Sequence, residues 1–159
     1  MNINDILDYL IRIGEAKAKL MDDILDITQK QSLNIGEEHI DVLSDLIQQK
    51  QKCIDKINVL NKEFIEKYDD IKQNLNVASL AEINSNEYPS VIKLKTTIQS
   101  IDKVVQQIQQ LEKINNKKML DALGAVKEQI TNIKNSRKVN AVYNQGMPIY
   151  VGVFIDKKK

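Results

Sequence analysis

Glycine, proline and aromatic residues are scarce in this sequence of 159 residues, which has five glycines, two prolines and no tryptophan. Sheet proteins use glycine and proline at turns and aromatic residues in strands, so their scarcity indicates long helices. The single cysteine excludes an internal disulfide. One histidine with one cysteine cannot supply an ordinary structural zinc site, and we expect no cofactor and no enzymatic activity.

Long apolar runs are absent as well, so we expect no membrane-spanning helix and no stable membrane insertion. Asp5 and Asp8 lie where a signal peptide would be basic, which predicts a cytoplasmic protein. The formal net charge of +1 gives no general attraction to nucleic acid. Two small basic clusters, at residues 113–118 and 134–138, contain no aromatic residues and are interpreted as solvated helix faces.

What the sequence does contain is apolar residues three and four positions apart, the spacing of an amphipathic helix. This pattern predicts three helices, over residues 4–33, 37–75 and 90–139. Asn4 is the predicted N-cap of the first helix, and residues 76–89 form the longer of the two connections. We therefore predict an all-α fold, an elongated antiparallel three-helix bundle or coiled coil over residues 1–139 with an extended C-terminal tail.

The second predicted helix has the clearest register, with a seam residue every 3.5 positions as in a left-handed coiled coil. Lys50 and Asn61 stand inside the seam, where polar residues either fix the register of packed helices or point outwards at a frayed flank. Cys53 lies on the apolar side and is interpreted as a small core residue rather than a nucleophile. The remaining seam positions are Leu43, Ile47, Ile54, Ile57, Phe64, Tyr68, Ile71 and Leu75.

Residues 140–159 differ in composition from the rest, because three of the seven aromatic residues gather there. Residues 149–155 are mostly β-branched or aromatic and favour an extended conformation, so we predict a partner-binding tail. The charge is also divided, since residues 1–76 carry a net −5 and residues 77–159 a net +6. This division favours docking of the third helix on the first two, and steering of an acidic partner stays open as the alternative.

Few side chains offer chemistry. His39 follows two glutamates at a predicted helix start and is interpreted as a plain surface residue. A divalent-ion site near the first connection would lack the Asp-x-Asp-x-Asp-Gly loop of calcium proteins, so a solvated acidic end is the favoured interpretation. The residues in question are Asp22, Asp23, Asp26, Glu37 and Glu38.

Several short segments of the sequence are distinctive when taken together. They are residues 29–31, residues 43–57 followed by Leu60 and Phe64, residues 115–123 with two asparagines at their start, and the C-terminal segments 141–143 and 154–159. With these stretches the sequence resembles the FlgN-type flagellar export chaperones, in a form found in a clostridia-like subgroup. The resemblance extends over essentially the whole chain. It implies an elongated helical bundle that acts as a cytosolic chaperone.

The resemblance also implies partners. Such chaperones hold the C-terminal segment of the hook–filament junction proteins FlgK and FlgL, and they dock on the cytosolic domain of the export-gate protein FlhA. Tyr143 is the closest match to the family's gate-docking tyrosine. We expect the apolar tail residues Ile149, Tyr150 and Phe154 to share this docking role.

The client segment is expected to fold as an amphipathic helix on the third helix, over surface that the shorter helices leave open. Two other functions stay open. One is a structural coiled coil or adaptor that forms a homodimer, and the other is a flagellar chaperone of the filament-cap type. The predicted client-binding positions are Ile98, Ile101, Val105, Ile108, Met119, Leu123, Val126 and Ile130.

Overall fold

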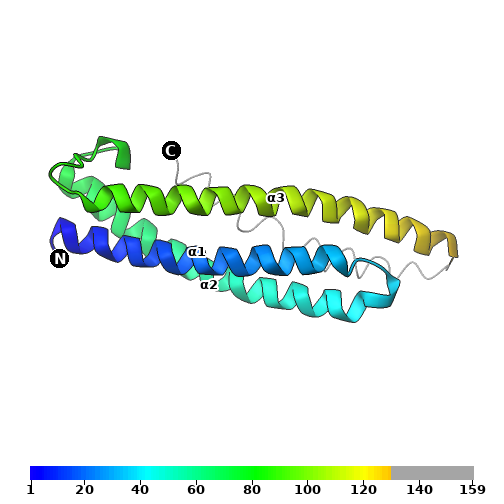
Figure 1. The fold of residues 1–159 in the computed structure, drawn as a ribbon. Coiled ribbons are helices and arrows are strands. Elements are labelled where there is room, and N and C mark those ends of the chain that lie inside the picture. Colours follow the sequence, from blue (N-terminus) through cyan, green and yellow to red (C-terminus); the bar gives the residue numbers. More distant parts are fainter. Residues whose placement is uncertain (130–159) are drawn as a thin grey trace.

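The computed structural model describes residues 1–129, with the backbone alone described at residue 37 and at residues 126–129. The regular structure of this part is α1 (Ile3–Leu33), η1 (Glu37–His39), α2 (Ile40–Leu75), η2 (Leu80–Glu82) and α3 (Ser90–Gln129). The predicted all-α bundle is therefore confirmed, and Figure 1 shows its elongated shape. The predicted end of the third helix and the tail lie outside the described residues.

The first helix begins earlier than predicted, because its N-cap is Asn2 rather than Asn4. The Asn2 side chain accepts a hydrogen bond from the Asp5 backbone N–H at 2.9 Å. In return the Asp5 carboxylate accepts one from the Asn2 backbone N–H at 3.3 Å. This capping box satisfies two backbone donors that a helix start leaves without helical acceptors.

The three helices alternate in direction, and α1 packs against both α2 and α3 (Figure 1). The short connection after Leu33 makes α1 and α2 antiparallel, whereas α3 runs parallel to α1. Ser90 donates a hydrogen bond to Asp8 at 3.2 Å, and Lys118 donates one to Ser32 at 2.9 Å. These two contacts join α1 and α3 at opposite ends of the bundle.

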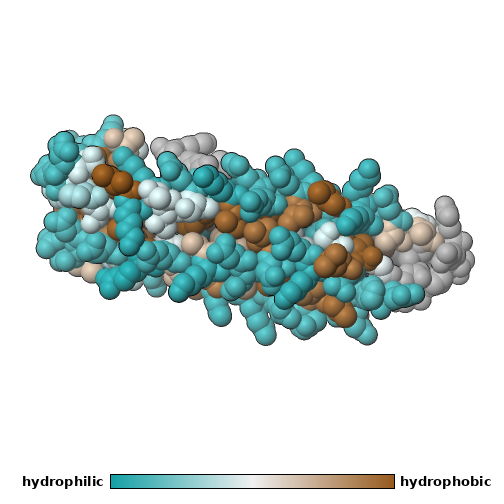
Figure 2. Space-filling view, in the orientation of Figure 1, coloured by the Kyte–Doolittle hydropathy of each residue, from teal (hydrophilic) through white to brown (hydrophobic). Residues whose placement is uncertain are grey.

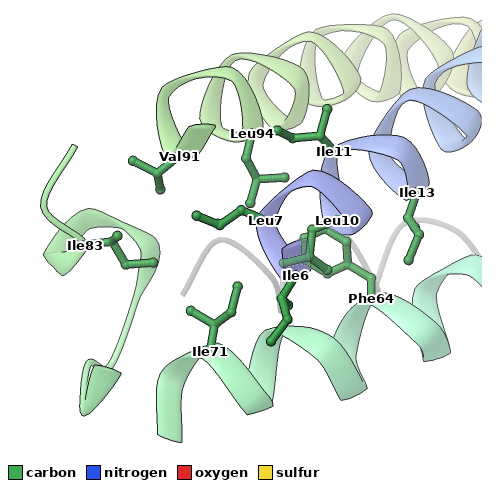
Figure 3. Close-up of a cluster of buried hydrophobic side chains, with 10 residues drawn as sticks. All are labelled: Ile6, Leu7, Leu10, Ile11, Ile13, Phe64, Ile71, Ile83, Val91 and Leu94. Atoms are coloured by element: carbon green, nitrogen blue, oxygen red, sulfur yellow. The ribbon is translucent and has the colours of Figure 1, made fainter. Parts of the chain in front are cut away.

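The buried apolar side chains form three clusters along the bundle. The proximal cluster lies around the start of α1, where Figure 3 shows side chains of α1, α2, α3 and the loop residue Ile83 converging. The central cluster contains Met21, Ile24, Ile54, Ile57, Ile101, Val105 and Ile108. The distal cluster contains Leu43, Ile47 and Met119, with Ile35 and Leu123 packed against it.

One glycine allows α1 and α3 to approach closely. A Cβ atom added at Gly14 would lie 3.0 Å from Cγ2 of Thr97, which is closer than ordinary van der Waals contact. Glycine costs about 1 kcal/mol in a helix interior relative to alanine. The absence of a side chain at position 14 leaves room for Thr97 of α3.

Candidate partner-binding end of the bundle

Most of the predicted client-binding residues on α3 belong to the protein's own core. Ile101, Val105 and Ile108 are 0–5% exposed and pack in the central cluster, and Met119 is 2% exposed in the distal cluster. Ile98 is partly buried against the proximal cluster. The expectation that shorter helices leave these residues open is wrong, because α1 and α2 extend far enough to cover them.

The last three predicted positions have a different setting. Leu123 is partly buried against the distal cluster. Val126 lies in the last described turn of α3, where only the backbone is described, and Ile130 lies just outside the described residues. Leu123 is therefore the predicted position with a described side chain that lies at the edge of the distal cluster.

The third helix continues beyond the hairpin of α1 and α2. Lys118 contacts Ser32, which is the last residue but one of α1, and α3 extends to Gln129. The eleven residues after Lys118 correspond to about 16 Å of helix. Figure 1 shows this end of α3, in gold, passing the connection between α1 and α2. We call this end of the molecule the distal end.

Large apolar side chains are exposed around the distal end. Leu33 is 82% exposed and Leu120 is 62% exposed. In Figure 2 most of the brown surface on the visible face lies in the half of the molecule that holds the connection between α1 and α2. The exposed apolar residues near this end are Leu33, Ile40, Val42, Ile114 and Leu120.

The exposed residues of α3 do not share one face. Leu123 is four residues after Met119 and three after Leu120, so it lies between them around the helix and the three residues form one apolar stripe along α3. Ile114 precedes Leu120 by six residues, which places it about 120° away around the helix. Leu120 is therefore the exposed edge of a stripe that begins in the core, whereas Ile114 stands apart from it.

A buried polar layer separates the distal cluster from the central one. Lys50 of α2 donates a hydrogen bond to Gln31 of α1 at 2.6 Å and forms an ion pair with Glu112 of α3. Each of the three residues is at most 3% exposed. Beside them, Asn115 donates to the backbone carbonyl of Thr28 at 3.1 Å. We call these five residues the distal polar layer.

Burial lowers the pKa of Lys50, because the low-dielectric interior disfavours its charged form, and the neighbouring Glu112 carboxylate opposes this shift. A buried ion pair is rarely a large source of stability, since both charges lose their hydration. It does discriminate against other registers, in which a buried charge would face an apolar side chain. The predicted role of Lys50 in register is consistent with this geometry.

A second polar contact lies between the proximal and central clusters. Lys17 of α1 donates a hydrogen bond to the Asn61 side chain of α2, and both residues are at most 5% exposed. Asn61 is thus also a buried seam residue, as the sequence predicts. Along the bundle, polar residues therefore divide the core at two levels.

The described residues present little reactive chemistry. None of the His, Cys, Asp and Glu side chains within residues 1–129 gather in threes to hold a metal ion. His39 is exposed, as predicted. Cys53 is partly buried against the central cluster, and its burial, with a smaller effect from Asp23, raises the pKa of the thiol. A high thiol pKa keeps the group protonated and unreactive at neutral pH.

The residues predicted to dock on the export gate, Tyr143, Ile149, Tyr150 and Phe154, lie outside the described part of the chain. Sequence reasoning did not select Leu33, Ile40 or Leu120 for the candidate site. Leu33 and Ile40 flank the connection between α1 and α2, and no heptad pattern reveals which side chains at a helix end face solvent.

The arrangement defines a class: an all-α bundle whose candidate binding surface is built from helix faces at one end. None of the described helices combines the length and the apolar character that crossing a bilayer requires. Residues 1–146 match the FlgN protein family, and the chain belongs to this family. Membership implies a flagellar export chaperone, with flagellar proteins as partners. No curated protein and no solved structure matches the chain.

Proposed function

We propose that this protein is a cytosolic chaperone that binds the C-terminal helical segment of the hook–filament junction proteins FlgK and FlgL and delivers them to the export gate. Family membership supports the chaperone class. The clients and the delivery step rest on the resemblance of the sequence to the chaperones of this family.

The observation that carries the proposal is the apolar stripe of α3 at the distal end. Leu120 and Leu123 continue the stripe of Met119 past the level where α1 ends. An amphipathic client helix that covers this stripe would remove apolar surface from water, which yields roughly 25 cal/mol per Å². Ordering a disordered client costs several kcal/mol, so the expected complex is moderately tight and releases its client for export.

Leu120→Asp tests this surface. The side chain is 62% exposed, so the substitution should leave the bundle folded while it places a carboxylate against the apolar face of the client. Ile114→Asp is the matched control, because Ile114 is 50% exposed but lies outside the stripe. We expect Leu120→Asp to weaken binding of a FlgK or FlgL C-terminal peptide at least tenfold in isothermal titration calorimetry, with little change for Ile114→Asp.

Equal affinity of the two variants and the unmodified protein would contradict the assignment of this surface. Co-expression with each candidate client, followed by size-exclusion chromatography, separates the remaining functions. Co-elution with a filament-cap protein instead of FlgK or FlgL would identify the other chaperone type. A stable homodimer that retains no client would identify a structural coiled coil.

The tail is proposed to dock on the cytosolic domain of FlhA through Tyr143, Ile149, Tyr150 and Phe154. Deletion of residues 140–159 should impair FlhA binding without changing the helical content measured by circular dichroism, because the described core lies within residues 1–129. A variant carrying alanine at the four named positions is the more conservative test. Unchanged affinity for FlhA in both variants would refute this role.

A further inference from the structure

The three core clusters differ in size, and the smallest one lies beside the proposed client surface. Within residues 1–129, the proximal cluster has ten buried apolar residues and the central cluster has seven. The distal cluster has three, Leu43, Ile47 and Met119. Segments with few buried apolar contacts open locally more often than the rest of a protein. Among the described residues, the distal end therefore has the fewest buried apolar contacts and the lowest expected cost of opening.

The distal polar layer marks where such an opening ends. If α3 separated from the hairpin up to Glu112, water would reach Lys50 and Glu112 and restore the hydration that burial removed. Separation beyond this level would expose Ile108 and Ile54, which are fully buried in the central cluster. Exposure of the distal polar layer to water thus costs little free energy, whereas exposure of the central cluster costs the free energy of its apolar burial.

We propose that the distal end opens when the client binds, so that the client helix packs on Met119, Leu43 and Ile47 as well as on the outer stripe of α3. This inference rests on the proposed chaperone function. Its support is continuity, since Leu123 packs against the distal cluster and lies, around α3, between Met119 of that cluster and the exposed Leu120. The client helix then replaces the hairpin as the apolar partner of Met119, and it replaces α3 as the apolar partner of Leu43 and Ile47.

Covalent closure of the distal end tests this proposal. Ser32→Cys and Lys118→Cys, made together with Cys53→Ser, place one thiol on each helix at the level where Nζ of Lys118 lies 2.9 Å from Oγ of Ser32, and a bis-maleimide spans the gap that the shorter cysteine side chain leaves. Asp8→Cys with Ser90→Cys gives the matched control, because these side chains link the same two helices at 3.2 Å at the opposite end. Both cross-linked proteins keep the full chain.

The probe is a synthetic peptide of the C-terminal segment of FlgK or FlgL, titrated into each protein before and after cross-linking. The distal cross-link should weaken binding at least tenfold, and the proximal one should leave it unchanged. Equal binding by both cross-linked proteins overturns the opening while the chaperone function stands. Absence of binding to any form, including the unmodified protein, instead refutes the proposed function and the opening with it.

Hydrogen exchange of the free protein provides a second measurement. Backbone amides of residues 113–123 should exchange at least tenfold faster than those of residues 98–108 on the same helix. Replacing the polar layer by Gln31→Leu, Lys50→Met and Glu112→Leu makes the core continuous and should reduce this difference. Equal exchange of the two segments in the unmodified protein overturns the proposal.

Discussion

Removal of one partner of the buried ion pair is the most informative stability test that this structure offers. In Glu112→Leu, Lys50 keeps its burial, at 3% exposure, but loses the carboxylate that opposes the lowering of its pKa. The ammonium group then either stays charged without its counterion or loses its proton at neutral pH, and both outcomes are costly. Leaving one charge of a buried pair uncompensated destabilises proteins by about 3–5 kcal/mol.

Such a loss is large for a chain of this size, because domains are stable by only about 5–15 kcal/mol. The matched control is Glu15→Leu, which removes the exposed ion pair between Glu15 and Lys93, whose atoms lie 3.2 Å apart. Exposed pairs contribute about 0–1 kcal/mol because water and salt screen them. Urea unfolding followed by circular dichroism at 222 nm gives the free energy of unfolding of each variant.

A further comparison separates the loss of the pair from the loss of the negative charge. The triple variant Gln31→Leu, Lys50→Met and Glu112→Leu removes the whole polar contact, and it should be as stable as the unmodified protein or more stable by about 1–4 kcal/mol. A Glu112→Leu variant that loses no more stability than Glu15→Leu would refute the assignment of a buried, interdependent pair.

Two further predictions concern α1 and α2. Gly14→Ala should be more favourable by about 0.5–3 kcal/mol in a Thr97→Ser background than alone, because serine lacks the methyl group that the new Cβ would meet. Equal effects in both backgrounds, measured by urea unfolding, would contradict this contact. The pKa of the Cys53 thiol is raised in the folded state, so the folded protein keeps the thiol proton to a higher pH than the unfolded chain does. The contribution of the Cys53 thiol to stability is therefore complete below about pH 8.5, the pKa of a free cysteine, and declines as the pH rises. Cys53→Ala should therefore flatten the loss of stability between pH 8 and pH 10, and an unchanged slope would refute the shift.

The sequence predicted the helices well because their apolar spacing is long and regular. It also identified Lys50 and Asn61 as seam residues, and both are buried in the structure. Their partners Lys17 and Glu112 could not be assigned from the sequence, since they come from other helices. Which residues meet across a bundle depends on the sliding register of the helices, and no local pattern encodes that register.

The same limitation explains the error at the candidate site. Ile101 and Leu123 occupy equivalent apolar positions in the pattern of α3, yet Ile101 is 3% exposed in the central cluster while Leu123 lies at the edge of the distal cluster. The distinction arises because α1 ends at Leu33, opposite the region of Lys118. Only the three-dimensional register shows where the covering helices end.

The parallel course of α1 and α3 has a practical consequence for how the protein is attached to a sensor surface. The chain's first residue, Met1, is 74% exposed and lies at the proximal end, whereas Leu120 belongs to the distal end. A helix of 40 residues such as α3 is about 60 Å long. An N-terminal tether would therefore hold the rod by one end and present the proposed client surface to solution at the other.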